Sequence, residues 1–409
     1  MPGHARTDGR DVIFAWEQCK LSDISEKSYE KNTDNKYSTV LTNSAEYGIV
    51  KQRDFFDKDI ANSSNISGYY VVRKNYFVYN PRISNQAKFG PINRNKLDES
   101  GIMSPLYLVF TVHDIDESFL ETLFQTTTWH RFMYQNGDTG ARADRFAIKD
   151  STFMSMPIKV PSLEEQHKLA LAFQKLDQTI TLHEEKKHQL ERLKSALLQK
   201  MFADKSGYPD IRFEGFSDEW EQCKLGDLAD RVTTKNKGMV SELPLTISAQ
   251  DGLISQDEFF NKKVASKDLS SYLLLHHGDF AYNKSYSNGY PFGTIKRLEK
   301  YPQGVVSSLY IAFKPNSSIS SDFMAQYYES NNWHKEIYKC AAEGARNHGL
   351  LNVPPSDFFA TNLNIPITKS EQLKIGRLLN AVDQTITLHD QKLNLLKLVK
   401  QSLLQNMFI

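Results

Sequence analysis

LDQTITLH at residues 176–183 returns as VDQTITLH at residues 382–389, and each copy is followed by a second shared motif. That second motif reads LLQKMF at residues 197–202 and LLQNMF at residues 403–408. A likeness repeated over so long a period indicates a duplicated unit, not a solenoid of short repeats. The chain is therefore expected to consist of two similar halves, each closing with the same kind of segment.

Each half also opens on a shared motif. WEQCKLSD at residues 16–23 returns, displaced by 204 residues, as WEQCKLGD at residues 220–227. Short apolar runs such as SPLYLVF and SSLYIAF then alternate with Gly, Asn, Pro and Ser, which is typical of short strands with some helix. YPDIRFEGFSDEW introduces the second half, whereas GRDVIFAW stands in that place in the first. We expect a mixed α/β domain over 16–160 and over 216–366, a linker over 204–215 and an atypical N-terminal segment over 1–15.

A long helix is expected over 161–203 and over 367–409. Ser162 with Glu165, and Thr368 with Glu371, match the S/T-x-x-E capping box that starts helices. Apolar residues then recur alternately every four and three positions, which indicates a coiled coil. A helix of about 40 residues spans roughly 60 Å, so each helix suits the role of a spacer. The helix-packing stripe comprises Leu169, Phe173, Leu176, Ile180, His183, Leu190, Leu197 and Met201 in the first half, and Ile375, Leu379, Val382, Ile386, His389, Leu393, Leu396, Leu403 and Met407 in the second, with Lys187, Lys194 and Lys400 as polar interruptions.

The matched histidines His183 and His389 admit two interpretations. A polar residue at a coiled-coil core position can set the register of the two helices. A metal-binding or catalytic role is the less favoured alternative.

Bulk composition points to a folded protein of two or three domains. The 409 residues are 40% hydrophobic and 24% charged, as in ordinary globular proteins. Three widely spaced cysteines suggest neither disulfides nor a metal site, and no signal peptide or membrane span is evident, so a cytoplasmic location is expected. A net charge of +1 argues against a uniformly basic surface, so any nucleic-acid contact must be local.

No catalytic or metal-binding motif is found. The sequence has no P-loop and no HExxH motif, and its histidines are scattered, so no catalytic residue, metal site or bound cofactor is assigned to this chain. Tyr79-Asn80-Pro81-Arg82 is superficially like the NPP[FY] loop of DNA amino-methyltransferases, but the second proline is missing. Methyl transfer by this chain is therefore not expected.

A local binding signal remains in each half. No acidic residue occurs between Asp59 and Asp98, where cations are interleaved with Tyr and Phe; cations can meet phosphates and guanine, while Asn80, Asn85 and Gln86 could reach adenine. The alternative to DNA binding is a core strand whose solvent-exposed face carries the basic residues. The Gly-Ala-Arg arginines could equally form salt bridges. The candidate DNA contacts are Arg73, Lys74, Tyr79, Asn80, Arg82, Lys88 and Arg142 in the first half, and Tyr282, Asn283, Lys284, Lys296, Arg297 and Arg346 in the second.

The order of these motifs resembles the specificity subunits of type I restriction-modification systems. WEQCKLGD, FAYNKS, EGARNHGLL, the EEQ and SEQ helix starts, LDQTITLH and LLQKMF carry the likeness, which covers nearly the whole chain from Trp16 onward. It implies an α+β fold in which two target-recognition domains each read half of a split double-stranded DNA target. The helices would pair as an antiparallel coiled coil, which places the halves in pseudo-two-fold relation.

The resemblance also implies partners and assigns the chemistry to them. Two modification subunits would use S-adenosylmethionine to methylate adenines, and restriction subunits would cut unmodified DNA with ATP and Mg²⁺. This chain would be a non-catalytic subunit with no membrane partner. Two other classes stay open: an orphan DNA-binding or coiled-coil adaptor without a methyltransferase, which co-purification would distinguish, and a self-contained enzyme, which labelled S-adenosylmethionine would reveal.

Overall fold

The chain folds into two compact units. The computed structural model describes residues 16–55, 66–139, 144–262, 265, 268–285, 289–341 and 351–408. One unit comprises the residues up to 183 together with those from 392 onward, and the other comprises residues 184–391. No helix within the described ranges is long and apolar enough to cross a membrane. The segment 1–15 lies outside them.

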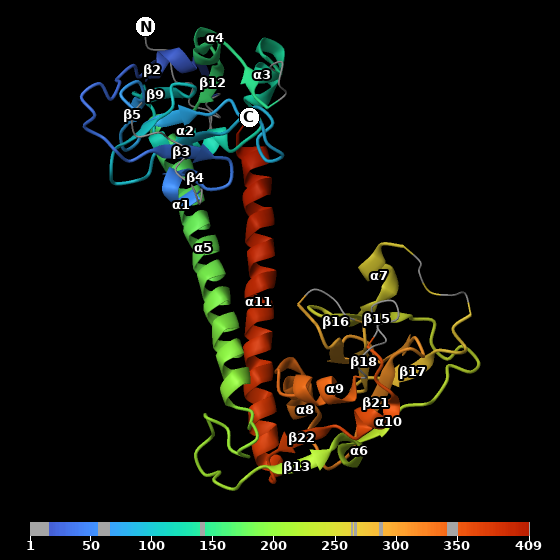
Figure 1. The fold of residues 1–409 in the computed structure, drawn as a ribbon. Coiled ribbons are helices and arrows are strands. Elements are labelled where there is room, and N and C mark those ends of the chain that lie inside the picture. The colour runs from blue at the N-terminus through green and yellow to red at the C-terminus, as the bar shows by residue number, and fades with distance from the viewer. Residues whose placement is uncertain are drawn as a thin grey trace, which may run out of the picture. The chain divides into compact units, whose positions relative to one another are not determined.

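An antiparallel four-stranded sheet, in the order β2-β9-β6-β7, forms the centre of the first unit (Figure 1). The unit also contains three antiparallel two-stranded pairs, β3-β4, β5-β8 and β1-β12, and the short pair β10-β11. The elements are β1 (Glu17–Lys20), η1 (Leu21–Asp23), β2 (Ser25–Lys27), β3 (Leu41–Ser44), β4 (Gly48–Lys51), α1 (Gln52–Phe55), β5 (Tyr70–Val72), β6 (Phe77–Tyr79), β7 (Ile92–Arg94), β8 (Gly101–Met103), β9 (Leu108–Val112), α2 (Glu117–Phe124), α3 (His130–Asn136), β10 (Asp138–Thr139), β11 (Phe146–Ala147), α4 (Asp150–Met154), β12 (Pro157–Val160) and the start of α5 (Leu163–Lys200).

The second unit repeats this topology with the sheet β14-β21-β18-β19 and the pairs β15-β16, β17-β20 and β13-β22. Antiparallel sheets with separate helices make each unit α+β, which confirms the predicted fold class. The elements are β13 (Glu221–Lys224), α6 (Leu225–Leu228), β14 (Ala229–Arg231), β15 (Leu245–Ser248), β16 (Gly252–Ser255), α7 (Gln256–Phe260), β17 (Leu273–His276), β18 (Phe280–Asn283), β19 (Thr294–Arg297), β20 (Gln303–Val306), β21 (Ile311–Pro315), α8 (Ser321–Glu329), α9 (His334–Cys340), α10 (Pro355–Phe359), β22 (Asn362–Ile365) and the start of α11 (Lys369–Met407).

The cores of the two units use the same aromatic pair. Phe77 of β6 stacks on Phe110 of β9 with ring centroids 5.5 Å apart, and Phe280 of β18 stacks on Phe313 of β21 at 5.2 Å. All four side chains are fully buried. Cross-strand aromatic pairs stabilise a sheet beyond the area they bury, so each domain is built around one duplicated contact.

Both long helices begin at the predicted caps, but each capping box is only half formed. Ser162 Oγ accepts from the Glu165 amide at 3.3 Å, and Thr368 Oγ1 accepts from the Glu371 amide at 3.4 Å. The glutamate side chains have partners elsewhere: Glu165 accepts from Trp16 Nε1 at 3.2 Å, and buried Glu371 pairs with Arg212 at 2.7 Å. Arg212 lies in the predicted linker 204–215, which is therefore fastened to the start of α11.

A buried glutamine joins the first domain to its own helix. Gln166 of α5 accepts from the backbone amide of Asp116, the N-cap of α2, at 2.9 Å and donates to the Pro161 carbonyl at 2.9 Å. Both ends of the amide side chain are thus used inside the protein. Gln166 thus joins α2 to α5, together with the contacts of His167 with Asp116 at 3.2 Å and of Gln174 with Ser118 at 2.7 Å.

Gln372 makes the same joint in the second unit. It accepts from the backbone amide of Ser320, the N-cap of α8, at 2.8 Å and donates to the Pro366 carbonyl at 3.0 Å. Nearby, α8 lies along α11 (Figure 1), and Gln326 donates to both Asn380 and Asp383 of that helix. The glutamine in the EEQ and SEQ motifs is therefore architectural.

The two long helices pair antiparallel, as predicted. In the first unit, Asp177 of α5 pairs with Lys400 of α11 at 2.7 Å, while Phe173 meets Phe408 with ring centroids 5.8 Å apart. Residue numbers therefore rise on one helix as they fall on the other. Figure 1 shows the C-terminus beside α2, where the Phe408 ring stacks on Phe119 at 5.5 Å.

Interhelical ion pairs occupy the polar positions of the stripe. In the second unit, Lys194 pairs with Asp383 at 2.6 Å and Lys187 with Asp390 at 2.5 Å. Lys194 and Lys400 are equivalent positions of the repeat, as are Asp177 and Asp383. Each unit thus holds the same ion pair, with the lysine and the aspartate contributed by opposite halves of the chain.

The stripe is less exposed than the flanking helix positions, with one exception. Leu403 keeps 36% of its surface exposed, and the neighbouring Leu404 packs against the first core instead. Near the end of α11, Leu404 and not Leu403 therefore points toward the core. This corrects the expectation that Leu403 belongs to the helix-packing stripe. Buried positions are Leu169, Phe173, Ile180, Met201, Ile375, Leu379, Val382 and Leu393, and half-buried ones are Leu176, His183, Leu190, Leu197, Ile386, His389, Leu396 and Met407.

We predict that Gln372→Leu lowers the free energy of unfolding by about 1–3 kcal/mol, because the buried amide of Ser320 loses its acceptor. Urea unfolding followed by circular dichroism measures the change. Gln391→Leu, at an exposed position of the same helix, is the matched control and should leave stability unchanged. Equal stability of the two variants would show that Gln372 does not hold the joint.

We also predict that a fragment of residues 1–206 forms a symmetric dimer. It retains all of α5, including both Asp177 and Lys194, so two copies can make the same ion pairs and cover the apolar stripe. Sedimentation equilibrium measures the association. Asp177→Lys should weaken it by setting like charges opposite each other, and adding Lys194→Asp should restore it. A folded monomer would contradict the prediction.

Candidate nucleic-acid interface

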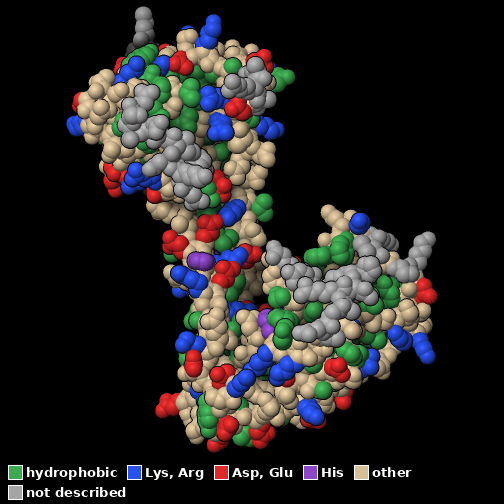
Figure 2. Space-filling model, viewed as in Figure 1, with side chains coloured by type: hydrophobic (Ala, Val, Ile, Leu, Met, Phe, Trp, Pro, Cys, Tyr) green, Lys and Arg blue, Asp and Glu red, His purple; other side chains and the backbone are tan. Residues whose placement is uncertain are grey.

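Charge is mixed over the surface. On the face drawn in Figure 2, Lys and Arg side chains are interspersed with Asp and Glu side chains in each unit. No group of three or more His, Cys, Asp or Glu side chains that could hold a metal ion occurs in the described part of the chain. An interface for DNA must therefore be local, and the loops that follow β6 and β18 are the duplicated places where the sequence signal falls.

A rigid frame holds the loop 81–89 of the first unit. The hydroxyl of Tyr79, at the end of β6, donates to the Phe89 carbonyl at 2.9 Å and ties the loop ends together. Asn80 Oδ1 accepts from the Arg82 amide at 3.0 Å, which forms an Asx turn. Gly90 has φ +82°, and a Cβ there would lie 2.0 Å from the Asn80 carbonyl oxygen, so glycine is required where the loop closes.

The same frame is present in the second unit at the two ends of the segment 284–292, within which residues 286–288 lie outside the described residues. The Tyr282 hydroxyl donates to the Phe292 carbonyl at 2.8 Å, and Asn283 Oδ1 accepts from the Ser285 amide at 3.0 Å. Gly293 has φ +79°, and a Cβ there would lie 2.2 Å from the Asn283 carbonyl oxygen. The repeated Tyr-Asn and Phe-Gly motifs therefore build a loop base, whereas the residues carried on that base differ.

Three candidate DNA contacts belong to this frame and do not reach the surface. Tyr79 and Tyr282 are 3% and 0% exposed, and their rings stack on Phe153 at 4.6 Å and on Phe358 at 5.0 Å. Burial raises the pKa of both hydroxyls. Asn80 is 7% exposed and donates to a backbone carbonyl in the domain. This placement corrects the expectation that Tyr79, Asn80 and Tyr282 touch DNA.

The first loop presents free cations. Arg82 and Lys88 are exposed, and no hydrogen bond or ion pair joins either side chain to another described residue. A backbone bridge pairs Arg82 with Arg145, which is also exposed. Nothing in the sequence singles out Arg145, because only the folded chain brings it beside the loop. Burial, and then the charge of Lys88, lower the pKa of His130, against which the loop rests.

Arg73 and Lys74 already have partners. Arg73 pairs with Glu30 at 2.6 Å and donates to the Tyr37 hydroxyl at 3.2 Å, while Lys74 pairs with Asp98 at 2.7 Å. These pairs lie at the surface, where ion pairs are weak. DNA phosphates could displace the carboxylates, so both cations stay candidates.

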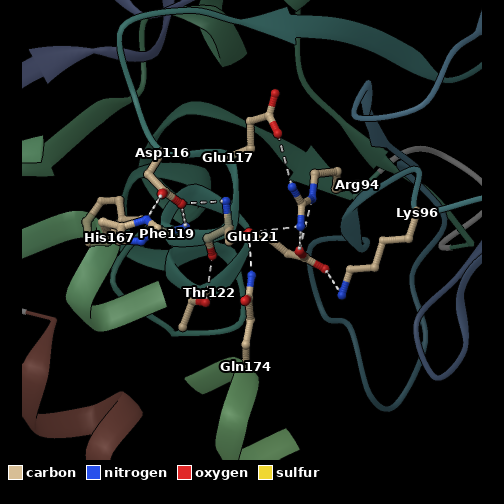
Figure 3. A network of polar contacts seen from close by, with 10 residues as sticks. Arg94, Lys96, Asp116, Glu117, Phe119, Glu121, Thr122, His167 and Gln174 are labelled. Carbon is tan, nitrogen blue, oxygen red and sulfur yellow. Dashed lines mark hydrogen bonds and ion pairs between the residues drawn. The ribbon is translucent and has the colours of Figure 1, made fainter. Parts of the chain in front are cut away.

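Arg94, the last residue of β7, forms ion pairs with the domain helix α2. Its guanidinium lies between Glu117 and Glu121 of α2, at 3.2 and 2.9 Å, and Lys96 contacts the other oxygen of Glu121 (Figure 3). The Arg94 side chain is largely buried. It clamps β7 to α2 and is not available to a ligand.

Arg297 of β19 is the counterpart of Arg94 in the second unit, and Lys296 is its neighbour on the same strand. Arg297 pairs with Asp322 at 2.8 Å and with Glu299 at 2.7 Å, and Lys296 pairs with Glu329 at 2.5 Å. Both cations are largely buried against α8. The expectation that Lys296 and Arg297 contact DNA is corrected, because their charges are neutralised inside the domain.

The remaining candidates stay predictions. Lys284 is half-buried, its ammonium donates to the Val353 carbonyl at 3.4 Å, and burial lowers its pKa. Asn283 is half-buried in the loop frame. Arg142 and Arg346 lie outside the described residues.

Comparison with known proteins identifies the domain type of the first half of the chain. The model of the type I restriction modification DNA specificity domain matches residues 15–192. The HsdS subunit from Thermoanaerobacter tengcongensis is 14% identical, with 98% of each chain covered and a TM-score of 0.47. The type I restriction-modification system S subunit from M. genitalium is also 14% identical over 98% of each chain, with a TM-score of 0.56, which shows a shared fold. Residues 15–192 are therefore a type I restriction modification DNA specificity domain, and the second half of the chain repeats the motifs and topology of this domain.

Proposed function

We propose that this chain reads a bipartite DNA target, one half-site through the domain at 16–160 and the other through the domain at 216–366. The observation that carries the proposal is the pair of identical loop frames bearing different loops. A frame fixed by Tyr, Asn and Gly presents whatever residues lie between them at a constant place in the domain. Two different loops on one frame suit two different half-sites.

Phosphate contact in the first half is assigned to Arg82, Lys88 and Arg145. All three are exposed, and they meet at one loop through the bridge between Arg82 and Arg145. Phosphate contacts fix the position of a protein on DNA, whereas contacts with base edges supply specificity. Arg73, Lys74, Arg142, Asn283, Lys284 and Arg346 are further candidates.

The helices are proposed to dock the catalytic subunits. Leu182 of α5 and Leu388 of α11 occupy the same position of the DQTITLH motif and are 64% and 63% exposed. An exposed leucine retained in the best-copied motif of both halves supports a binding surface presented twice. Two modification subunits, one at each leucine, account for this duplication.

The chemistry is assigned to the partners. The modification subunits would supply S-adenosylmethionine-dependent methylation of adenine, and restriction subunits would cut DNA with ATP and Mg²⁺. This chain would contribute the target sequence and the scaffold. An adaptor without a methyltransferase partner is the alternative, and it predicts that no modification subunit co-purifies.

We predict that Arg82→Ala, Lys88→Ala and Arg145→Ala each weaken DNA binding by the assembled complex to a similar degree on all sequences. Loss of one phosphate contact should lower the slope of log affinity against log salt by about 1. Fluorescence anisotropy at several salt concentrations measures both quantities. Lys186→Ala, at an exposed position of α5, is the matched control. Unchanged affinity and slope in all three loop variants would exclude this contact.

Leu182→Asp and Leu388→Asp should each reduce the number of bound modification subunits from two to one, and the double variant should bind none. Burying an unpaired carboxylate in an interface is strongly unfavourable. Native mass spectrometry of the co-expressed complex counts the subunits. Leu171→Asp is the matched control, because Leu171 is exposed but Arg377 stands at its repeat position. Full occupancy in the double variant would place the docking surface elsewhere.

A further inference from the structure

The tip of the first loop is a tight turn that presents two amide side chains. The Ser84 amide donates to the Ala87 carbonyl at 3.1 Å, and the Ala87 amide donates back to the Ser84 carbonyl at 3.2 Å. This reciprocal pair leaves Asn85 and Gln86 as the two central residues. Both are exposed, and neither side chain is hydrogen-bonded within the described ranges.

The stem of the loop is braced on a second segment of the domain. The Ile83 amide donates to the Asp144 carbonyl at 2.9 Å, and the Phe146 amide donates to the Pro81 carbonyl at 2.8 Å. On the other side, the Phe89 ring packs against His130 and Phe146, both with centroids 5.1 Å away. The turn is therefore held at a fixed place before any ligand arrives, which lowers the entropy lost on binding.

The chemistry of the tip differs from that of its flanks. Asn and Gln each offer one acceptor and one donor pair, which match N6 and N7 of adenine in the major groove. Arg82 and Lys88 stand on either side of the turn in the sequence and carry the positive charge that phosphates attract. Neutral amides between two cations are suited to read bases while the flanks hold the backbone.

We propose that Asn85 and Gln86 are specificity-determining residues that read adenine in the half-site of the first domain. The inference rests on the proposed function and refines it by assigning base contact to the turn and phosphate contact to its flanks. One half-site should therefore contain at least one A·T pair whose exchange weakens binding by roughly ten- to hundredfold.

The test compares base preference in the assembled complex. The methylated motif of the wild-type complex defines the two half-sites, and binding is then measured on duplexes with each pair exchanged in turn. Asn85→Ala with Gln86→Ala should abolish the preference for A·T at one or two pairs of a single half-site and leave the other half-site unchanged. Neither residue has a positive φ, so alanine fits the turn.

A second variant keeps the test independent of any change in the shape of the turn. Gln86→Glu retains the size of the side chain and replaces its donor with an acceptor, which pairs with the N4 amine of cytosine; the preference should move from A·T to C·G. Gln189→Ala, an exposed amide on α5, should leave every preference intact. If both loop variants keep the wild-type preferences, the inference is wrong, whereas a wild-type complex without a bipartite motif would overturn the proposed function itself.

Discussion

In each unit, a buried glutamine is part of the hydrogen-bonded joint between the domain and its helix. Gln166 and Gln372 bind the backbone at the N-cap of a domain helix and a proline carbonyl at the start of a long helix. A buried amide left without partners is costly, so these contacts resist opening. Everything that the domain presents, including the loop on its Tyr-Asn frame, inherits its direction from this joint.

The repeat divides the chain into parts that must stay alike and parts that are free to differ. The glutamine joint, the frame tyrosine and the Arg94 and Arg297 clamps recur with nearly the same distances in both units. All of them are buried or half-buried, and they bond to the backbone or to carboxylate side chains of the same unit. In the first loop, by contrast, Arg82, Asn85, Gln86 and Lys88 are exposed and their side chains have no hydrogen-bond or ion-pair partner among the described residues, so the fold does not fix their identity.

The positions of the long helices could be predicted from the sequence, whereas the direction in which individual side chains point could not. The alternate spacing of apolar residues by four and three positions located the helices, because this spacing can be recognised without knowing what the apolar stripe packs against. The basic and aromatic composition after Asp59 drew attention to the loop 81–89, but it did not show which side chains of this region are buried and which are exposed. Tyr79 and Arg297 have the residue types of DNA contacts, yet one closes a loop and the other clamps a helix. Arg145 carried no signal, because it reaches Arg82 only through a backbone bridge.

The Lys194–Asp383 and Lys400–Asp177 pairs also constrain how such a chain can evolve. Each lysine is matched by an aspartate from the opposite half, so a change in one half can be compensated only in the other. Recombination that exchanges whole domains between related genes preserves these matches when the crossover points fall outside the helices. The coiled coil can therefore stay constant while the domains that it carries change.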